Sequence, residues 1–125
     1  MKILIVEDNQ EMRRTLKDFI GDLVEGVYEC RDGSQALAAY TQYRPDWVLM
    51  DILMEKVNGL EATRQIKAAY PTARIIMVTS CRGDDMKNAA RVAGASEYVV
   101  KDNLQELRRI LTKHTDDRPS QLIVN

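Results

Sequence analysis

Acidic, hydroxyl and amine side chains follow several short apolar runs of this chain, at the point where each run ends. The acids are Glu7, Asp8 and Asp51, the hydroxyl is Thr79 and the amine is Lys101. Parallel strands that are buried on both faces are continuous apolar runs, and ligands bind outside the carboxyl ends of such strands. If these runs lie parallel in one sheet, all of these side chains meet at one edge.

The three acids indicate a site for a cation. Carboxylates about 4 Å apart repel by roughly 4 kcal/mol per pair at an effective dielectric constant of about 20. Oxygen ligands suit Mg²⁺, which keeps several waters and takes one or two carboxylates together with phosphate oxygens. A carboxylate beside such an ion and a lysine can attack a phosphoryl group and hold it as an acyl phosphate. The residue types therefore predict phosphoryl chemistry that uses Mg²⁺.

The apolar runs alternate with segments of helical periodicity, which predicts five consecutive βα units. Strands are expected before Glu7, Asp51, Thr79 and Lys101, and a further strand is expected from Val27 to Cys30. The intervening helical stripes are clearest at Met12, Leu16, Phe19 and Ile20, and at Leu104, Leu107, Ile110 and Leu111. Such alternation predicts an α/β fold with a parallel sheet covered by helices on both faces.

Composition and charge exclude several classes of protein. The 125 residues are 45% hydrophobic and 30% charged, with a formal net charge of −1. This balance provides no basic surface for nucleic acid or an anionic membrane, and no apolar stretch approaches the ~20 residues that span a bilayer. The chain starts directly with a predicted strand, and Cys30 and Cys81 have no metal or redox spacing, so we expect a cytoplasmic protein without a signal peptide.

The length predicts one domain, which we place at residues 1–114. Residues 115–125 lose the helical periodicity and gather Asp116, Asp117 and Pro119. This segment is therefore predicted to be a C-terminal tail or the start of a linker.

Five short segments, in this order, resemble the receiver domain of two-component response regulators. The resemblance covers about residues 2 to 113. Its segments are Ile5–Asn9 (IVEDN), Leu49–Met54 (LMDILM), Asn58–Ala62 (NGLEA), Val78–Ser80 (VTS) and Gly94–Lys101 (GASEYVVK). It implies a flavodoxin-like (βα)5 three-layer sandwich whose five-stranded parallel sheet has the order 2-1-3-4-5.

The resemblance also implies a role for each site residue. Asp51 is the phosphoacceptor, and Glu7 and Asp8 are the acidic pair that binds Mg²⁺ together with Asp51. Leu53 contributes its backbone carbonyl to the metal, and Lys101 pairs with the phosphoryl group.

Signalling roles follow from the same resemblance. Thr79 and Tyr98 are the switch pair, which changes conformation when the acceptor is phosphorylated. The phosphoryl group comes from a histidine kinase or a phosphotransfer protein. A homodimer that forms on phosphorylation is possible in such a family. A receiver is a signalling switch and not a metabolic enzyme, and we expect this chain not to bind DNA.

Two positions depart from the family pattern. Glu55 stands where family members usually carry a proline, which adds a negative charge to the loop after Asp51. Lys101-Asp102 replaces the frequent Lys-Pro, which is similar to the LuxR-type subgroup of response regulators. A cis bond before a residue other than proline costs about 2.5–4 kcal/mol, so we expect this peptide bond to be trans.

Other readings of the same residues predict different proteins. Taken singly, Glu7 and Asp8 could cap a helix and Lys101 could be a solvated lysine. A phosphatase of the haloacid dehalogenase type needs a second acid where Leu53 stands, and a flavodoxin-like cofactor binder needs a phosphate loop where the acidic segment 7–10 stands. A receiver that is never phosphorylated is a further alternative, and the complete set of site residues argues against it.

Overall fold

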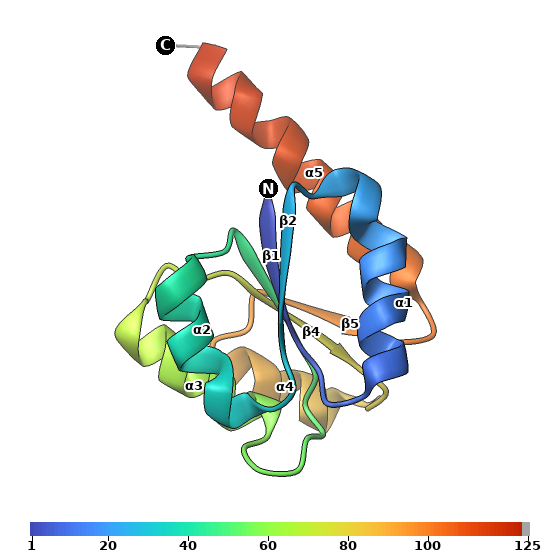
Figure 1. Cartoon of the computed structure of the whole chain (residues 1–125), viewed down its shortest axis with the longest axis vertical. Helices are drawn as coiled ribbons and strands as arrows, with labels where there is room; N and C mark the ends of the chain where they lie inside the picture. Colours follow the sequence, from blue (N-terminus) through green and yellow to red (C-terminus); the bar gives the residue numbers. More distant parts are fainter. Residues whose placement is uncertain (124–125) are drawn as a thin grey trace.

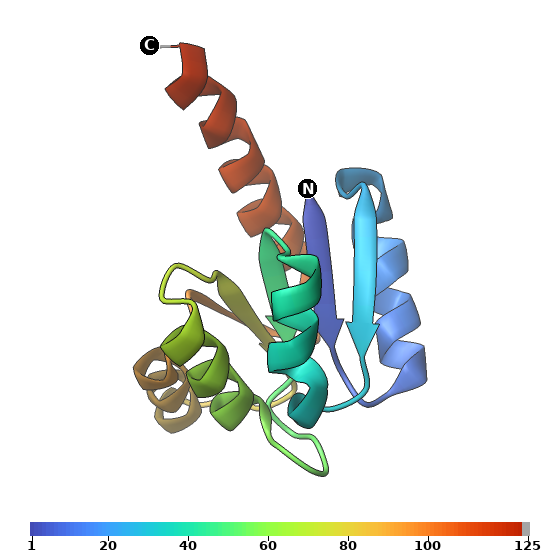
Figure 2. The same cartoon turned by 60° about the vertical axis from the view of Figure 1, so that its left-hand side comes forward.

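The computed structural model describes the backbone of residues 1–123 and the side chains of residues 1–113. Its centre is one parallel sheet with the strand order β2-β1-β3-β4-β5, as predicted. Figures 1 and 2 show the strands running in the same direction, with their carboxyl ends at one edge. The strands are β1 (Lys2–Val6), β2 (Gly26–Cys30), β3 (Trp47–Met50), β4 (Ile75–Thr79) and β5 (Glu97–Val100).

Helices cover both faces of this sheet, so the domain has three layers. The helices are α1 (Gln10–Ile20), α2 (Ala36–Tyr43), α3 (Gly59–Ala69), α4 (Asp84–Ala93) and α5 (Leu104–Ile123), with short 3₁₀ turns η1 (Gly21–Leu23) and η2 (Gly33–Gln35). In Figure 1, α1 and α5 lie on one face, and α2, α3 and α4 lie on the other. This arrangement confirms the predicted α/β class and its five βα units.

The core consists of two apolar clusters, one on each face of the sheet. Side chains alternate between the faces along a strand. Leu4 and Val6 of β1 therefore join the cluster under α2, α3 and α4, while Ile3 and Ile5 join the cluster under α1 and α5. Burial on both faces explains why these strands are continuous apolar runs in the sequence.

Side-chain caps and a glycine set several helix ends. Asn9 Oδ1 accepts a hydrogen bond from the Met12 amide at 2.8 Å and begins α1. Asn58 Oδ1 accepts one from the Glu61 amide at 3.0 Å and begins α3. Gly94 ends α4 with φ of 113°, a left-handed conformation that a side chain would disfavour.

The last helix is longer than the sequence predicts. α5 runs from Leu104 to Ile123, although helical periodicity ends near residue 114. An existing helix extends without a new nucleation step, so a polar segment can continue it without a buried stripe. The domain boundary at residue 114 stays a prediction, and residues 124–125 of the predicted tail lie outside the described residues. Across the described residues, no helix has the length and apolarity that crossing a membrane requires.

Candidate functional site

The predicted site residues lie at the carboxyl edge of the sheet. Val6 and Met50 are register partners, so Glu7 after β1 and Asp51 after β3 lie side by side. The Asp51 amide donates to the Val6 carbonyl at 3.0 Å, which extends the strand pairing to the acid itself. On the other side, the Lys101 amide donates to the carbonyl of Thr79 at 2.8 Å. The order of the strands thus brings together residues that are far apart in the sequence.

Three carboxylates form a compact group at this edge. Glu7, Asp8 and Asp51 each place one carboxylate oxygen within 4.8 Å of the other two. Glu7 is 2% exposed and Asp51 is 5% exposed, while Asp8 faces solvent. Buried acids with an open side suit an ion that keeps part of its water shell.

Lys101 supplies the positive charge beside the two buried acids. Its Nζ atom lies 2.8 Å from Glu7 Oε1 and 3.2 Å from Asp51 Oδ2. The pKa of Lys101 is raised, because the hydrogen bond to Glu7 and the charge of Asp51 outweigh the opposing effect of burial. The lysine is therefore held as a cation between the two acids.

Glu7 is the most perturbed acid of the group. Burial raises the pKa of its carboxyl to about 7, although the Lys101 ammonium and the Asn9 amide partly oppose this. The Asn9 amide donates to Glu7 Oε2 at 3.1 Å, and the Lys101 ammonium lies 2.8 Å from Glu7 Oε1. One ammonium group does not neutralise three acids, so the three carboxylates fit a divalent cation as a further partner.

Thr79 and Tyr98 both contact the backbone of one residue, Cys81. Thr79 is fully buried, and its Oγ1 atom accepts a hydrogen bond from the Cys81 amide at 3.3 Å. The half-buried Tyr98 donates its hydroxyl to the Cys81 carbonyl at 2.8 Å. Residue 81 therefore links the predicted switch pair through its backbone, a role that its side-chain type gives no means to predict.

The loop after Asp51 packs closely against the start of α3. The Gly59 amide donates to the Ile52 carbonyl at 2.8 Å, and a Cβ atom at position 59 would lie 2.0 Å from the Asp51 carbonyl oxygen. Gly59 belongs to the NGLEA segment, and its residue type alone predicts no role at the site. The Leu53 side chain is 58% exposed. The role of the Leu53 backbone carbonyl as a metal ligand stays a prediction.

Both departures from the family pattern lie beside the site. Glu55 lines a pocket of about 240 Å³ with Asp8 and Lys56, so it adds charge at the solvent side of the carboxylates. Asp102 pairs with Arg82, which joins the loops after β5 and β4. The described residues contain no cis peptide bond, which confirms the trans Lys101-Asp102 bond.

Comparisons with known proteins place this chain in one family. The model of the response regulator receiver domain matches residues 3–112. The chemotaxis protein CheY of Halobacterium salinarum is 37% identical over 100 residues, which are 80% of this chain and 83% of that protein. The response regulator protein VraR of Staphylococcus aureus is 35% identical over 103 residues, and this chain spans 49% of its length.

A solved structure agrees with these matches. The response regulator domain of Thermotoga maritima CheB has a TM-score of 0.81 and 28% identity, over 90% of this chain and 94% of that one. The chain belongs to the response regulator receiver domains, the signalling switches of two-component systems. Members of this family bind Mg²⁺ at an acidic pocket and interact with histidine kinases and phosphotransfer proteins.

Proposed function

We propose that this chain is a phosphorylation-controlled switch in which Asp51 accepts the phosphoryl group. The observation that carries the proposal is the convergence of three carboxylates within 4.8 Å, with Lys101 paired to two of them. An isolated buried acid would be costly, and these contacts keep Asp51 close to both a cation and a predicted metal site.

Glu7, Asp8, Asp51 and the Leu53 carbonyl would hold Mg²⁺, which neutralises charge on the transferring phosphoryl group. One Asp51 oxygen attacks the phosphorus atom of a phosphohistidine, the phosphorus–nitrogen bond breaks, and the imidazole leaves with its electron pair and takes up a proton. Lys101 already lies 3.2 Å from Asp51, so a short movement lets it pair with a phosphoryl oxygen.

The switch would follow from the hydrogen bonds around Cys81. A phosphoryl group adds acceptor oxygens and negative charge, to which the Thr79 hydroxyl can donate. Because Thr79 now accepts from the Cys81 amide, its movement disturbs the backbone of the residue whose carbonyl also holds Tyr98. The tyrosine and the surface of β5 and α4 would then change their preferred conformation, which is a population shift between two states.

The partner in this proposal is a histidine kinase or a phosphotransfer protein, and the setting is the cytoplasm. Phosphorylation would change self-association, and the chain would not bind DNA itself, since its net charge is −1. Phosphatase activity on free esters is not favoured, because position 53 carries a leucine and no second acid.

Intact-mass measurement tests the acceptor directly. Incubation with acetyl phosphate and Mg²⁺ should add one phosphoryl group to the wild type and none to Asp51→Asn. Asp18→Asn, which removes an exposed acid of α1, is the matched control and should be labelled like the wild type. Equal labelling of Asp51→Asn and wild type would refute Asp51 as the acceptor.

A further inference from the structure

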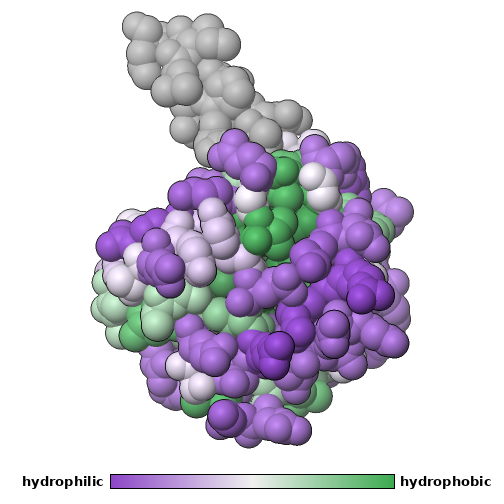
Figure 3. Space-filling model, viewed as in Figure 1, coloured by the Kyte–Doolittle hydropathy of each residue, from purple (hydrophilic) through white to green (hydrophobic). Residues whose placement is uncertain are grey.

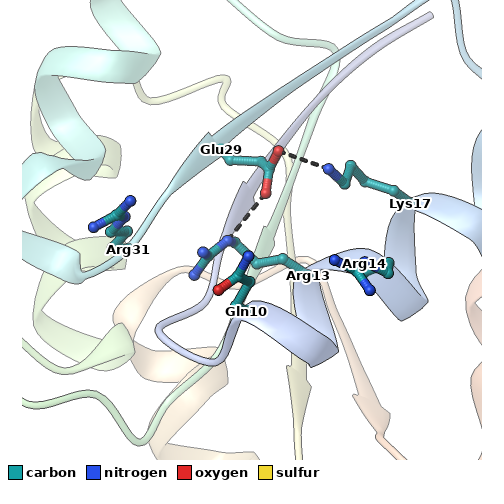
Figure 4. A pocket seen from close by; sticks show the side chains of 6 residues that line it. All are labelled: Gln10, Arg13, Arg14, Lys17, Glu29 and Arg31. Carbon is teal, nitrogen blue, oxygen red and sulfur yellow. Dashed lines mark hydrogen bonds and ion pairs between the residues drawn. The ribbon is translucent and has the colours of Figure 1, made fainter.

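A polar pocket lies between α1 and β2, beside the edge that carries the three carboxylates, and Arg31 lines both this pocket and the one at Asp8 and Glu55. Figure 3 shows a hydrophilic surface over α1 and the nearby end of β2. The pocket has a volume of about 310 Å³ and is lined by Gln10, Arg13, Arg14, Lys17, Glu29 and Arg31 (Figure 4). Four basic side chains and one acid therefore face a single concavity in a chain whose net charge is −1.

Glu29, the one acid that lines this pocket, already pairs with two basic side chains. Glu29 Oε1 accepts from Arg13 Nε at 3.0 Å, and Glu29 Oε2 accepts from Lys17 Nζ at 3.0 Å (Figure 4). The hydrogen bond from Lys17, together with that from Arg13, lowers the pKa of Glu29, so it stays an anion. Its single charge is shared by two cations, and a positive excess remains in the pocket.

The basic side chains differ in how they are held. Arg13 is 8% exposed, and its Nη1 donates to the Glu7 carbonyl at 2.8 Å, so its guanidinium is fixed in place. Arg14 and Arg31 are exposed, and neither side chain has a hydrogen bond or ion pair with any described residue. Figure 4 shows Arg31 coming from the end of β2 and Arg14 from α1, so these two groups flank Arg13 from different elements.

We propose that this pocket binds a small anion with adjacent phosphate groups, such as an inorganic or nucleoside diphosphate. Guanidinium groups match phosphate oxygens with two parallel hydrogen bonds, and three of them line this pocket. The volume is at the lower end of the roughly 300–1,000 Å³ typical of ligand pockets, which suits a compact ligand. The concave shape favours a small anion over an extended acidic peptide, which would need a longer groove.

A titration followed by amide NMR tests the site on the full chain. Inorganic pyrophosphate and, separately, ADP are added at low salt in EDTA, so that no Mg²⁺ recruits them to the carboxylates. We expect shifts confined to residues 10–17 and 29–31. Arg13 is left intact because it supports the backbone of Glu7. The double variant Arg14→Gln/Arg31→Gln should weaken binding about tenfold or more, since two charge-assisted contacts are lost.

The control variant is Arg64→Gln/Arg91→Gln, which removes the same charge from exposed positions on α3 and α4. It should bind like the wild type, and both variants should unfold at the wild-type temperature. Tighter binding of ADP than of pyrophosphate would identify a nucleotide, and equal binding would identify the phosphates alone. No shifts at residues 10–17, an equal loss in both variants, or tighter binding of a glutamate-rich peptide would overturn the proposal.

Discussion

Replacing Gly59 by alanine should move Asp51 out of place. A Cβ atom there would lie 2.0 Å from the Asp51 carbonyl oxygen and 2.7 Å from its carbonyl carbon. Real Cβ atoms keep at least 3.0 Å from other heavy atoms, so the two backbone segments must separate by about 1 Å. Neither segment is a flexible side chain that could turn aside.

The free energy of unfolding should fall in this variant. Forcing a methyl group into a packed site costs about 1–3 kcal/mol, whereas alanine stabilises a helix by at most about 1 kcal/mol relative to glycine. The clash therefore outweighs the helix propensity, and we expect a net loss of up to about 2 kcal/mol. For a domain of this size, the melting temperature should drop by about 3–5 °C per kcal/mol.

The rate of phosphorylation should fall by a larger factor than the stability of the fold. A misplacement of 1 Å can slow a reaction by up to about 100-fold, so labelling by acetyl phosphate and Mg²⁺ should be far slower in Gly59→Ala. The control is Gly21→Ala, because Gly21 has helical φ and ψ of −57° and −33° and an added Cβ would meet nothing within 4 Å. If Gly59→Ala melts and is labelled like Gly21→Ala, the close approach does not position the acceptor.

Further predictions concern the switch, the lifetime of the phosphoryl group and the two thiols. Thr79→Ala should still accept a phosphoryl group, but a phosphoryl mimic with Mg²⁺ should shift the Tyr98 amide less than in the wild type; equal NMR shifts would contradict this coupling. Leu53→Asn and Cys81→Glu should change the dephosphorylation rate, followed by intact mass, because neither native side chain can orient the attacking water. Unchanged rates in both variants would show that these two positions do not control access of the attacking water. Burial, with a smaller effect of Asp32, raises the pKa of Cys30 to about 11, so iodoacetamide at pH 8 should modify Cys81 much faster. The rate at Cys30 should rise as the pH approaches 11, and urea should abolish the difference; equal rates in the folded protein would contradict its burial.

Local patterns predict the elements of this fold because each pattern has a direct physical cause. The strands are buried on both faces, so they are apolar runs that the sequence alone makes visible. Gly94 ends α4, since a left-handed residue at that position favours glycine. The end of α5 is predicted less well, because helix extension depends on the helix already formed and not on the local stripe.

The amino-acid sequence by itself determines which side chains end each strand, and thereby the carboxylates, the hydroxyl and the lysine of the site. Only the tertiary structure decides that Lys101 contacts Glu7 as well as Asp51, and that Thr79 and Tyr98 both bond the backbone of Cys81. It also brings Arg31 from β2 to the arginines of α1. These contacts join segments that are distant in the sequence. They depend on backbone atoms and on the directions of side chains, which residue types alone do not predict.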